Sequence, residues 1–352
     1  MTTIVKRDYS LIGEESLRAV ERGLSQAQWY HTDVPRKRMK ELMHRRNGPA
    51  IRDTLLWIGL LVLFGGLGVY LWFSVWSLLS FAVYGVLYGS ASDARWHECG
   101  HGTAFRTRWM NVVVYYIACF MIMRDPTVWR WSHARHHTDT IIVGRDPEIV
   151  ARRPPPLWHI AADFFGLFAV PQAFKHMFIH ASGRLLPEEA TFIPDTEWPK
   201  TYWTARAWLV IYAGVATACV MSGSILPAMV IGLPRMYGAW HHLMTGLTQH
   251  SGLAEDVTDH RLNSRTVYMN PLTRFVYWNM NYHVEHHMFP MVPFHALPAL
   301  HAEIKDDLPA PAPSIAAAFG EFMPVLLRQR KDYQYHIRRQ LPDGANTVGS
   351  PS

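Results

Sequence analysis

Cysteine is scarce in this chain, and its scarcity excludes several kinds of site. Only three of the 352 residues are cysteines, Cys99, Cys119 and Cys219, and no two of them form a C-x-x-C pair. We therefore expect no disulfide framework, no rubredoxin-type site and no iron–sulfur cluster of the chain's own. The first nine residues also lack an apolar run after their basic residues, so we expect no cleavable signal peptide.

Charged residues are missing from two long stretches. Between Thr54 and Ser92 there is no Asp, Glu, Lys, Arg or His, and between Ala207 and Ala254 the only Asp, Glu, Lys or Arg is Arg235. A membrane-spanning helix needs about 20 mostly apolar residues, so each stretch is long enough for two helices. We predict transmembrane hairpins at 54–92, turning near Ser74, and at 207–246, turning near 222–224. Buried helices of a soluble protein are the alternative, but two charge-free runs of this length are rare in soluble cores.

Basic residues gather on the flanks of these stretches. The formal net charge is +6, and the clustered cations are Arg36, Lys37, Arg38, Lys40, Arg45, Arg46 and Arg52 before the first run and Arg328, Arg330, Lys331, Arg338 and Arg339 near the end. This is the positive-inside pattern of a membrane protein, so we expect a lipid bilayer and no nucleic acid as partner. The short uncharged turns should face away from the cytoplasm.

The sequence thus predicts an all-α, multi-pass membrane protein with about four transmembrane helices in two hairpins and a cytoplasmic helical cap. A mean hydropathy of −0.03 is too low for a chain lying wholly in lipid, and it favours such a cap. We predict a single domain over 1–341, with a cytoplasmic N-terminal segment at 1–53 and a disordered tail at 342–352. In a bacterium the protein would lie in the inner membrane, with its site facing the cytoplasm.

Histidine carries the chemical signal, with 20 copies gathered in clusters. Three boxes contain eight of them: His97 and His101; His133, His136 and His137; His283, His286 and His287. On a helix, residues three or four apart share a face, so each box can direct its imidazoles to one point. Zinc sites take three or four ligands, so eight imidazoles favour two metals. Imidazole suits iron, copper, nickel and zinc alike. A ninth candidate, His250, ends the fourth apolar run as His97 follows the second.

From about Asp53 to His301 the chain resembles the membrane fatty acid desaturase and hydroxylase superfamily, and most closely bacterial desaturase-like proteins. The resemblance is densest at His97–Gly102, at Trp131–His137 and at Asn281–Pro290, and 292–298 continues it. Members have three histidine boxes around a non-haem diiron centre. The segment 249–253 is similar to one that supplies a further ligand in bacterial alkane hydroxylases. The resemblance implies two iron ions, with no catalytic residue beyond the metal centre. The implied ligands are His97, His101, His133, His136, His137, His250, His283, His286 and His287.

The resemblance also implies an activity, an O2-dependent oxidoreductase that removes hydrogen from unactivated C–H bonds. We expect a desaturase acting on a fatty acyl chain or lipid-like substrate. A hydroxylase or monooxygenase is the alternative, because the position of the substrate over the metals decides between the two outcomes. The segment 259–266 resembles a bacterial subgroup that includes dihydrorhizobitoxine desaturases and rhizopine-catabolism oxygenases, which act on small polar molecules. A substrate of that kind stays open.

Electrons must come from another protein, because the chain has no His-Pro-Gly-Gly haem motif of a fused cytochrome b5. We expect a ferredoxin with its reductase, and a basic cytoplasmic face would steer an acidic carrier.

Several acidic residues near the boxes are candidates to hold an imidazole N–H from outside the metal centre. These are Glu98 and Glu285 within the boxes, and Asp146 and Glu148 after the second box. A surface salt bridge is the alternative for Asp146 and Glu148.

Arg235 stands out because a charge inside a membrane segment is costly and by default suggests function. We hypothesise that it meets a carboxylate of the substrate. Alternatively, Pro227 and Pro234 break this run so that Arg235 reaches the interface.

A rival interpretation starts from the first box, which also matches the H-E-x-x-H motif of zinc proteases, with Glu98 as general base. A membrane metalloprotease would leave the other six box histidines unused. A metal transporter would carry ionisable residues along several spanning helices. Metal analysis separates the first two, since two irons favour the oxidase and one zinc favours the protease.

Overall fold

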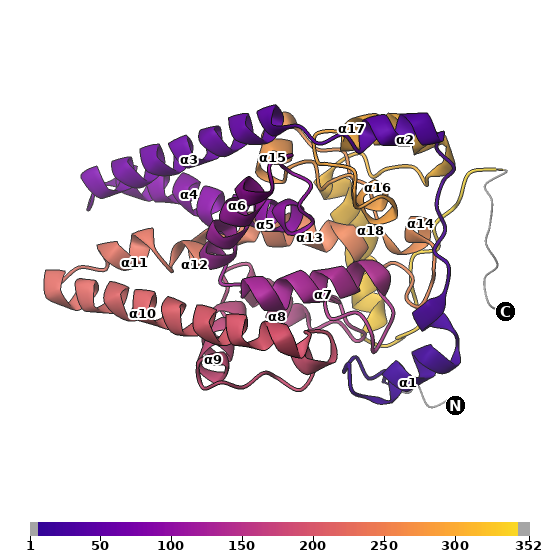
Figure 1. The fold of residues 1–352 in the computed structure, drawn as a ribbon, viewed down its shortest axis with the longest axis horizontal. Helices are drawn as coiled ribbons and strands as arrows, with labels where there is room; N and C mark the ends of the chain where they lie inside the picture. The colour runs from indigo at the N-terminus through magenta and orange to yellow at the C-terminus, as the bar shows by residue number, and fades with distance from the viewer. Residues whose placement is uncertain (1–5, 344–352) are drawn as a thin grey trace.

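The computed structural model describes residues 6–343, and within them the chain is helical, with β-pairing limited to two isolated bridges, Thr266 to Tyr282 and Val267 to Ala312. The all-α prediction is therefore confirmed for this part of the chain. Long helices extend toward one end of the molecule and short helices gather at the other, where both ends of the described chain lie (Figure 1). Most of the predicted tail, 344–352, lies outside the described residues.

The first predicted hairpin is present and turns where expected. It consists of α3 (Asn47–Tyr70) and α4 (Val75–Gly89), and α4 is followed directly by α5 (Ala91–Gly100). Ser74 begins α4 by accepting a hydrogen bond from the Ser77 N–H. The outward faces of both helices are apolar and exposed, as at Leu55, Val62 and Leu78, which suits contact with lipid.

The second hairpin differs from the prediction on its return leg. Its first helix, α10 (Trp198–Ser222), is continuous, but the returning chain is broken into α11 (Leu226–Val230), α12 (Pro234–Tyr237) and α13 (Trp240–His250). Pro227 and Pro234 each stand in the first turn of a short helix. Because proline has no N–H and clashes with the preceding turn, each one prevents a helix from continuing through it.

Three helical segments are therefore long and apolar enough to span a membrane: Arg36–Tyr70, Val75–Gly100 and Asp195–Ser222. A fourth span exists only if α6 (Arg108–Met121) and α7 (Pro126–Thr138) count as one, and these two are bent by 101°. The return leg of 207–246 is not one continuous helix, because its prolines break it, and it is not among these candidate spans.

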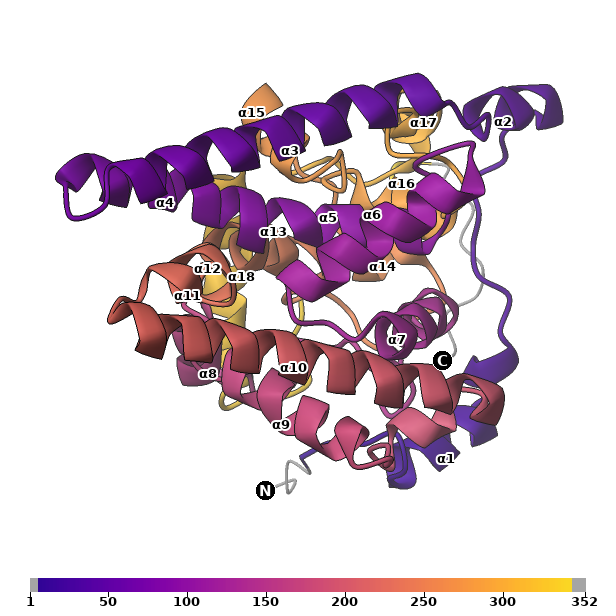
Figure 2. The same ribbon diagram turned by 60° about the vertical axis from the view of Figure 1, so that its left-hand side comes forward.

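The broken return leg packs against the first hairpin and thereby positions α13. A Cβ added to Gly238 would lie 1.8 Å from the carbonyl oxygen of Gly85, so this close approach requires glycine. The Ser90 hydroxyl donates to the Gly238 carbonyl at 2.6 Å and accepts the His242 N–H at 2.9 Å. These contacts hold α13 beside α5 (Figure 2).

Most of the remaining helices build the end of the molecule away from the hairpin turns, whereas α8 (Leu157–Asp163) and α9 (Ala169–Ala181) lie beside α10 (Figure 1). The other helices are α1 (Glu14–Glu21), α2 (Arg36–Leu42), α14 (His260–Asn263), α15 (Pro271–Val276), α16 (His283–Met288), α17 (Leu297–Ile304) and α18 (Ile315–Gln329). Short 3-10 turns lie at Leu24–Gln26, Glu189–Thr191, Asp195–Glu197 and Lys305–Asp307. One buried apolar cluster runs from Tyr30 to Leu308, so this end and the hairpins share a core.

Candidate metal centre

The histidine boxes lie at the ends of helices that converge between the hairpins and the short helices. His97 is on α5 and His101 caps that helix, the second box forms the last turns of α7, and the third box is α16 itself. The second box is held in register by the start of α7, where the Asp125 side chain accepts two backbone N–H groups and Pro126 follows. His250 is the last residue of α13.

The structure brings all nine predicted ligands together in two groups. The first group contains His97, His101, His133, His137 and His286, and the second contains His136, His250, His283 and His287. Within each group, the nitrogens that face inward all lie within 4.8 Å of one another. Each group combines residues from distant parts of the chain, so neither is a by-product of one helix. We name them the five-histidine group and the four-histidine group.

The spacing of the nitrogens fits metal ions. In the five-histidine group, His97 Nε2 lies 2.8 Å from His286 Nε2, and His133 Nε2 lies 3.1 Å from the Nε2 atoms of both His101 and His137. Two nitrogens bound to one ion at about 2.1 Å and at right angles to each other are about 3 Å apart. The observed separations are those of neighbouring ligands on one ion. The four-histidine group is alike, with His283 Nε2 at 2.9 Å from His250 Nε2 and 3.0 Å from His287 Nε2.

The protonation of the rings also favours a cation between them. The His250 Nδ1 lies 2.8 Å from the Asn263 carbonyl oxygen, which only accepts hydrogen bonds, so the proton of a neutral ring belongs on Nδ1. Its Nε2 lone pair then faces inward, toward that of His283. Burial lowers the pKa of His250, His283, His286 and His287 well below the usual histidine range, which keeps these rings neutral. Converging lone pairs on neutral imidazoles are the donor set that a metal requires.

Two acidic residues hold imidazoles from outside the groups. Asp146 Oδ2 accepts from His136 Nδ1 at 2.8 Å, and Glu148 Oε2 accepts from His133 Nδ1 at 3.1 Å. Burial alone would raise the pKa of Glu148, but His133, with smaller contributions from His136 and Arg124, lowers that pKa to about 2. Both carboxylates lie in the loop after α7, so the imidazole contact predicted for them is present in the structure, and the surface salt bridge is not.

Glu98 and Glu285 have other partners than the box histidines, although Glu285 does contact an imidazole, that of His301. The Glu98 carboxylate accepts the Phe294 N–H at 3.0 Å, and Glu285 contacts the His301 ring and the Thr266 hydroxyl. Each of these residues directly precedes or follows a box histidine on its helix. Adjacent helical positions do not face each other, so a glutamate beside a ligand points away from the metal that the ligand faces.

Arg235 lies away from the histidine groups. Its side chain is buried at the start of α12, and its Nε donates to the Ile122 carbonyl at 3.1 Å. It is not among the residues that line the cavity beside the histidines. The geometry therefore gives no support to contact with a substrate at that cavity. The prolines do break this run, as the alternative proposed, but Arg235 is buried in the protein.

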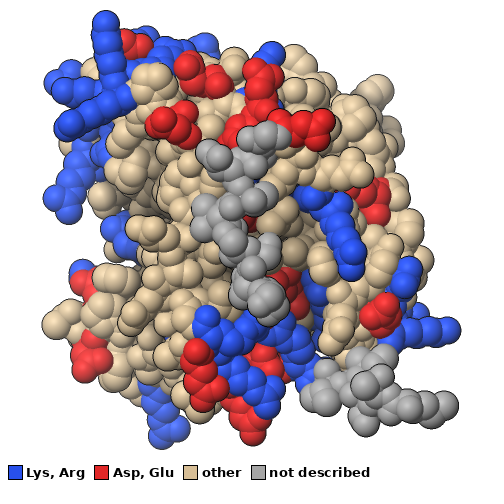
Figure 3. Space-filling model, turned by 90° about the vertical axis from the view of Figure 1, so that its right-hand side faces the viewer, with Lys and Arg blue, Asp and Glu red and all other residues tan. Residues whose placement is uncertain are grey.

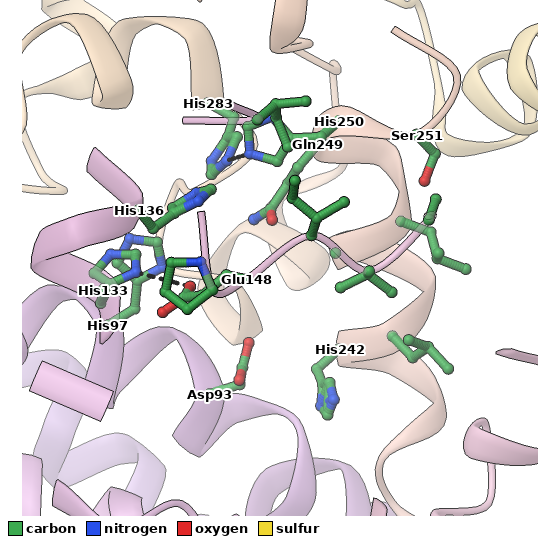
Figure 4. A pocket seen from close by; sticks show the side chains of 18 of the residues that line it. Asp93, His97, His133, His136, Glu148, His242, Gln249, His250, Ser251 and His283 are labelled. Atoms are coloured by element: carbon green, nitrogen blue, oxygen red, sulfur yellow. Dashed lines mark hydrogen bonds and ion pairs between the residues drawn. The ribbon is translucent and has the colours of Figure 1, made fainter. Parts of the chain in front are cut away.

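A cavity of about 260 Å³ opens beside both histidine groups. Figure 4 shows His97 and His133 on one side of it, His136, His250 and His283 above, and Asp93 and His242 together below. Apolar residues complete the wall: Ile149, Val150, Leu243, Leu247 and Leu253. Space for a small molecule thus lies directly against histidines of both groups.

Some residues around the centre were missed by sequence reasoning. The His260 ring lies 5.1 Å from that of His287 and stacks on Trp29 at 4.3 Å. The Thr140 hydroxyl lies 3.2 Å from His287 Nδ1. A lone histidine and a threonine carry no spacing signal, so only the fold reveals these contacts.

Comparison with known proteins gives a consistent result. The family model described as fatty acid desaturase matches residues 71–318, a range that includes the three boxes and His250. A probable fatty acid desaturase of Sorghum bicolor is 25% identical over 228 residues, which cover 57% of this chain and 56% of that protein.

Two further relatives support that match. The endoplasmic reticulum acyl-lipid omega-3 desaturase (cytochrome b5) of Arabidopsis thaliana is 24% identical over 227 residues, with 57% of this chain and 56% of the relative covered. A delta(9) fatty acid conjugase-like enzyme of Dimorphotheca sinuata is 23% identical over 282 residues, with 72% and 73% covered. The alignments with the Sorghum and Arabidopsis proteins thus span little more than half of each relative's length.

Proposed function

This chain belongs to the fatty acid desaturase family, and on that premise we propose that it is a membrane desaturase that uses O2 and two histidine-bound irons. The observation that carries the proposal is the convergence of nine imidazoles in two adjacent groups. Five imidazoles would hold one iron and four the other. When bound, the iron pair would supply, with O2, two electrons from the carrier and two protons from solvent, the oxidising power to remove two hydrogens from a saturated carbon–carbon bond, with two waters as the other product.

The residues around the groups orient the ligands and hold their protons. Asp146 and Glu148 keep the His136 and His133 protons on Nδ1, which leaves each Nε2 free for the metal. The Asn263 carbonyl does the same for His250. Because these outer bonds fix the ring planes, the ligand set is organised before a metal arrives.

The cavity supports a C–H-rich substrate. Its wall of Ile149, Leu247 and Leu253 offers an apolar surface next to the ligands His97 and His250, where an alkyl segment would exclude water. The relatives are named as fatty acid desaturases, so we propose a fatty acyl or lipid-like substrate for this chain also. The names of these relatives favour desaturation over hydroxylation. The geometry disfavours the rival protease, in which Glu98 would face the metal, because Glu98 accepts the Phe294 N–H instead.

We propose a separate one-electron carrier, such as a ferredoxin with its reductase, and a cytoplasmic site. Figure 3 looks onto the end of the molecule that carries α2, and Lys and Arg side chains gather at its upper left, with Asp and Glu side chains beside them. Within the described residues, several cations here form no ion pair: Arg36, Lys37, Lys40, Arg45 and Arg46. Unpaired cations beside a spanning helix favour the cytoplasmic side and attract an acidic carrier.

The test is aerobic turnover of purified, iron-loaded protein with a ferredoxin, its reductase and candidate acyl substrates, read by mass spectrometry. We expect O2-dependent loss of two hydrogens, absent under argon. Gain of one oxygen atom would instead establish a hydroxylase. One zinc per chain together with peptide hydrolysis would overturn the proposal.

A further inference from the structure

The cavity beside the histidine groups is lined by Asp93, whose carboxylate accepts hydrogen bonds from the described residues through only one of its two oxygens. Asp93 Oδ1 accepts hydrogen bonds from Arg124 at 2.8 Å and from the Trp96 indole at 2.9 Å. Asp93 Oδ2 has no hydrogen-bond partner in the described part of the chain, and the residue lines the cavity. Asp93 also belongs to the Val75–Gly100 span, where a charge is costly and suggests function.

A second ion pair in the same cavity provides a contrast. Glu255 pairs with Arg153 at 3.2 Å and accepts the Tyr9 hydroxyl at 2.7 Å through Oε1, while its Oε2 accepts from Arg7 at 3.4 Å. Both oxygens of Glu255 are therefore engaged, and this pair has a structural role. Of these two ion pairs, only Asp93–Arg124 keeps hydrogen-bonding atoms that have no partner among the described residues and could bind a ligand.

The position of Asp93 relative to the metal ligands is fixed by its helix. Asp93 and His97 are four residues apart on α5, so they share a face and lie about 6 Å apart along the axis, slightly more than one helical turn. Figure 4 shows Asp93 below His97 and Glu148, beside His242 and away from His250 and His283. A ligand group at Asp93 would thus sit one turn from the metal centre.

The opposite charges of Asp93 and Arg124 determine which chemical group of a ligand can bind between them. Arg124 uses one N–H on Asp93, and its other N–H groups have no hydrogen-bond partner among the described residues. Its guanidinium is held by stacking on Trp129 at 4.1 Å and on Trp96 at 4.9 Å. An ammonium ion would be repelled by Arg124 and a carboxylate by Asp93. A neutral hydroxyl satisfies both, because it donates to Asp93 Oδ2 and accepts from Arg124.

We propose that the Asp93–Arg124 pair is a recognition site for a hydroxyl group of the substrate. This rests on the proposed function and deepens it: the carbon–carbon bond that is oxidised lies within a few atoms of a hydroxyl, not far along a plain acyl chain. The volume agrees, since a cavity of about 150 Å³ holds benzene and this one measures about 260 Å³. A compact alcohol, or the hydroxylated part of a longer chain, fits the space.

The experiment measures binding, which needs no turnover. Full-length, iron-loaded protein in lipid nanodiscs is titrated by calorimetry with four six-carbon-ring probes: cyclohexanol, methylcyclohexane, cyclohexylammonium and cyclohexanecarboxylate. We expect cyclohexanol to bind at least about tenfold more tightly than the other three, a difference of about 1.4 kcal/mol. Asp93→Asn should remove this preference, and the control Glu255→Gln, on the fully bonded pair of the same cavity, should retain it.

Equal affinity for the four probes in the wild-type protein, a result that needs no variant to fold, would overturn the proposal. So would an unchanged preference in Asp93→Asn with normal iron content. The two hypotheses fail separately. A cyclohexanol preference without any O2-dependent desaturation refutes the proposed function alone, whereas desaturation of plain acyl chains without that preference refutes this inference alone.

Discussion

The two histidine groups differ in how their rings are held, although both are built from the same residue type. In the four-histidine group, His136, His250 and His287 each have an Nδ1 partner, namely Asp146, the Asn263 carbonyl and Thr140. In the five-histidine group, only His133 has such a partner among the described residues, and this is Glu148. The four-histidine group is thus oriented by outer hydrogen bonds in addition to the packing of its rings, as between His283 and His287 at 4.4 Å, whereas the five-histidine group is oriented mainly by packing.

The packing of the five-histidine group is visible in its ring contacts. The His97 ring lies 4.2 Å from that of His133 and 4.6 Å from that of His286, and His101 lies 4.6 Å from His137. Rings crowded this closely restrict one another without outer acceptors. The difference teaches that the same metal-binding chemistry can be organised by two means, and it predicts that changes outside the ligands affect the two groups unequally.

The largest effect is expected from removing a ligand in either group. His286→Ala in the five-histidine group and His283→Ala in the four-histidine group each take away one imidazole that no neighbour replaces. Loss of an outer partner costs about 10–100-fold in metal affinity, and loss of a ligand should exceed that range and abolish turnover. Iron per chain and O2-dependent turnover are the measurements. If either variant retained both, that histidine would not be a ligand.

A smaller effect that separates the groups is expected from Asp146→Asn. The Asp146 side chain is fully buried and lies 2.8 Å from His136 Nδ1. Its loss should weaken iron binding by the four-histidine group by about 10–100-fold, measured by competition with a chelator.

Glu148→Gln is the matched control in the five-histidine group. Its side chain is 14% exposed and its contact with His133 is longer, 3.1 Å, so its loss should cost less. A larger cost for Glu148→Gln than for Asp146→Asn would reverse the comparison.

Thr140→Val should have a modest effect. Its hydroxyl lies 3.2 Å from His287 Nδ1, and a neutral hydrogen bond contributes about 0.5–1.5 kcal/mol. We expect at most about a tenfold loss of iron affinity, since 1.4 kcal/mol corresponds to a factor of ten. The same chelator competition measures it, and a loss as great as that of Asp146→Asn would show that charge adds nothing to these outer bonds.

The smallest effect is expected from Glu98→Gln, since Glu98 accepts the Phe294 N–H and contacts no ligand of either group. Glutamine keeps an acceptor oxygen, so iron content and turnover should stay close to wild type. A zinc protease would lose its general base in this variant. Complete inactivation with normal metal content would therefore favour that rival.

The features predicted correctly from the sequence are those marked by recurring histidine spacings or by a long run without charged residues. The first hairpin followed from a charge-free run with Ser74 at its turn, and the nine histidines followed from helical spacing and family resemblance. The return leg of the second hairpin is broken at Pro227 and Pro234, a break that the alternative for Arg235 anticipated but that a hydropathy pattern alone does not reveal.

The sequence also did not predict the direction in which individual side chains point. Glu98 is next to His97 in sequence but points to a different side of α5, whereas Asp146 comes from a separate loop and reaches His136. Thr140 and Asn263, the partners of His287 and His250, belong to no recognisable sequence motif. Contacts between distant segments depend on the fold, and no local spacing encodes them.

The measurement that tests the central claim most directly is the metal content of the full-length protein after anaerobic loading with ferrous iron. Nine converging imidazoles in two groups predict two irons per chain, and one iron fewer when His250 is replaced by alanine. A single metal per chain that is unaffected by His250→Ala would contradict the account.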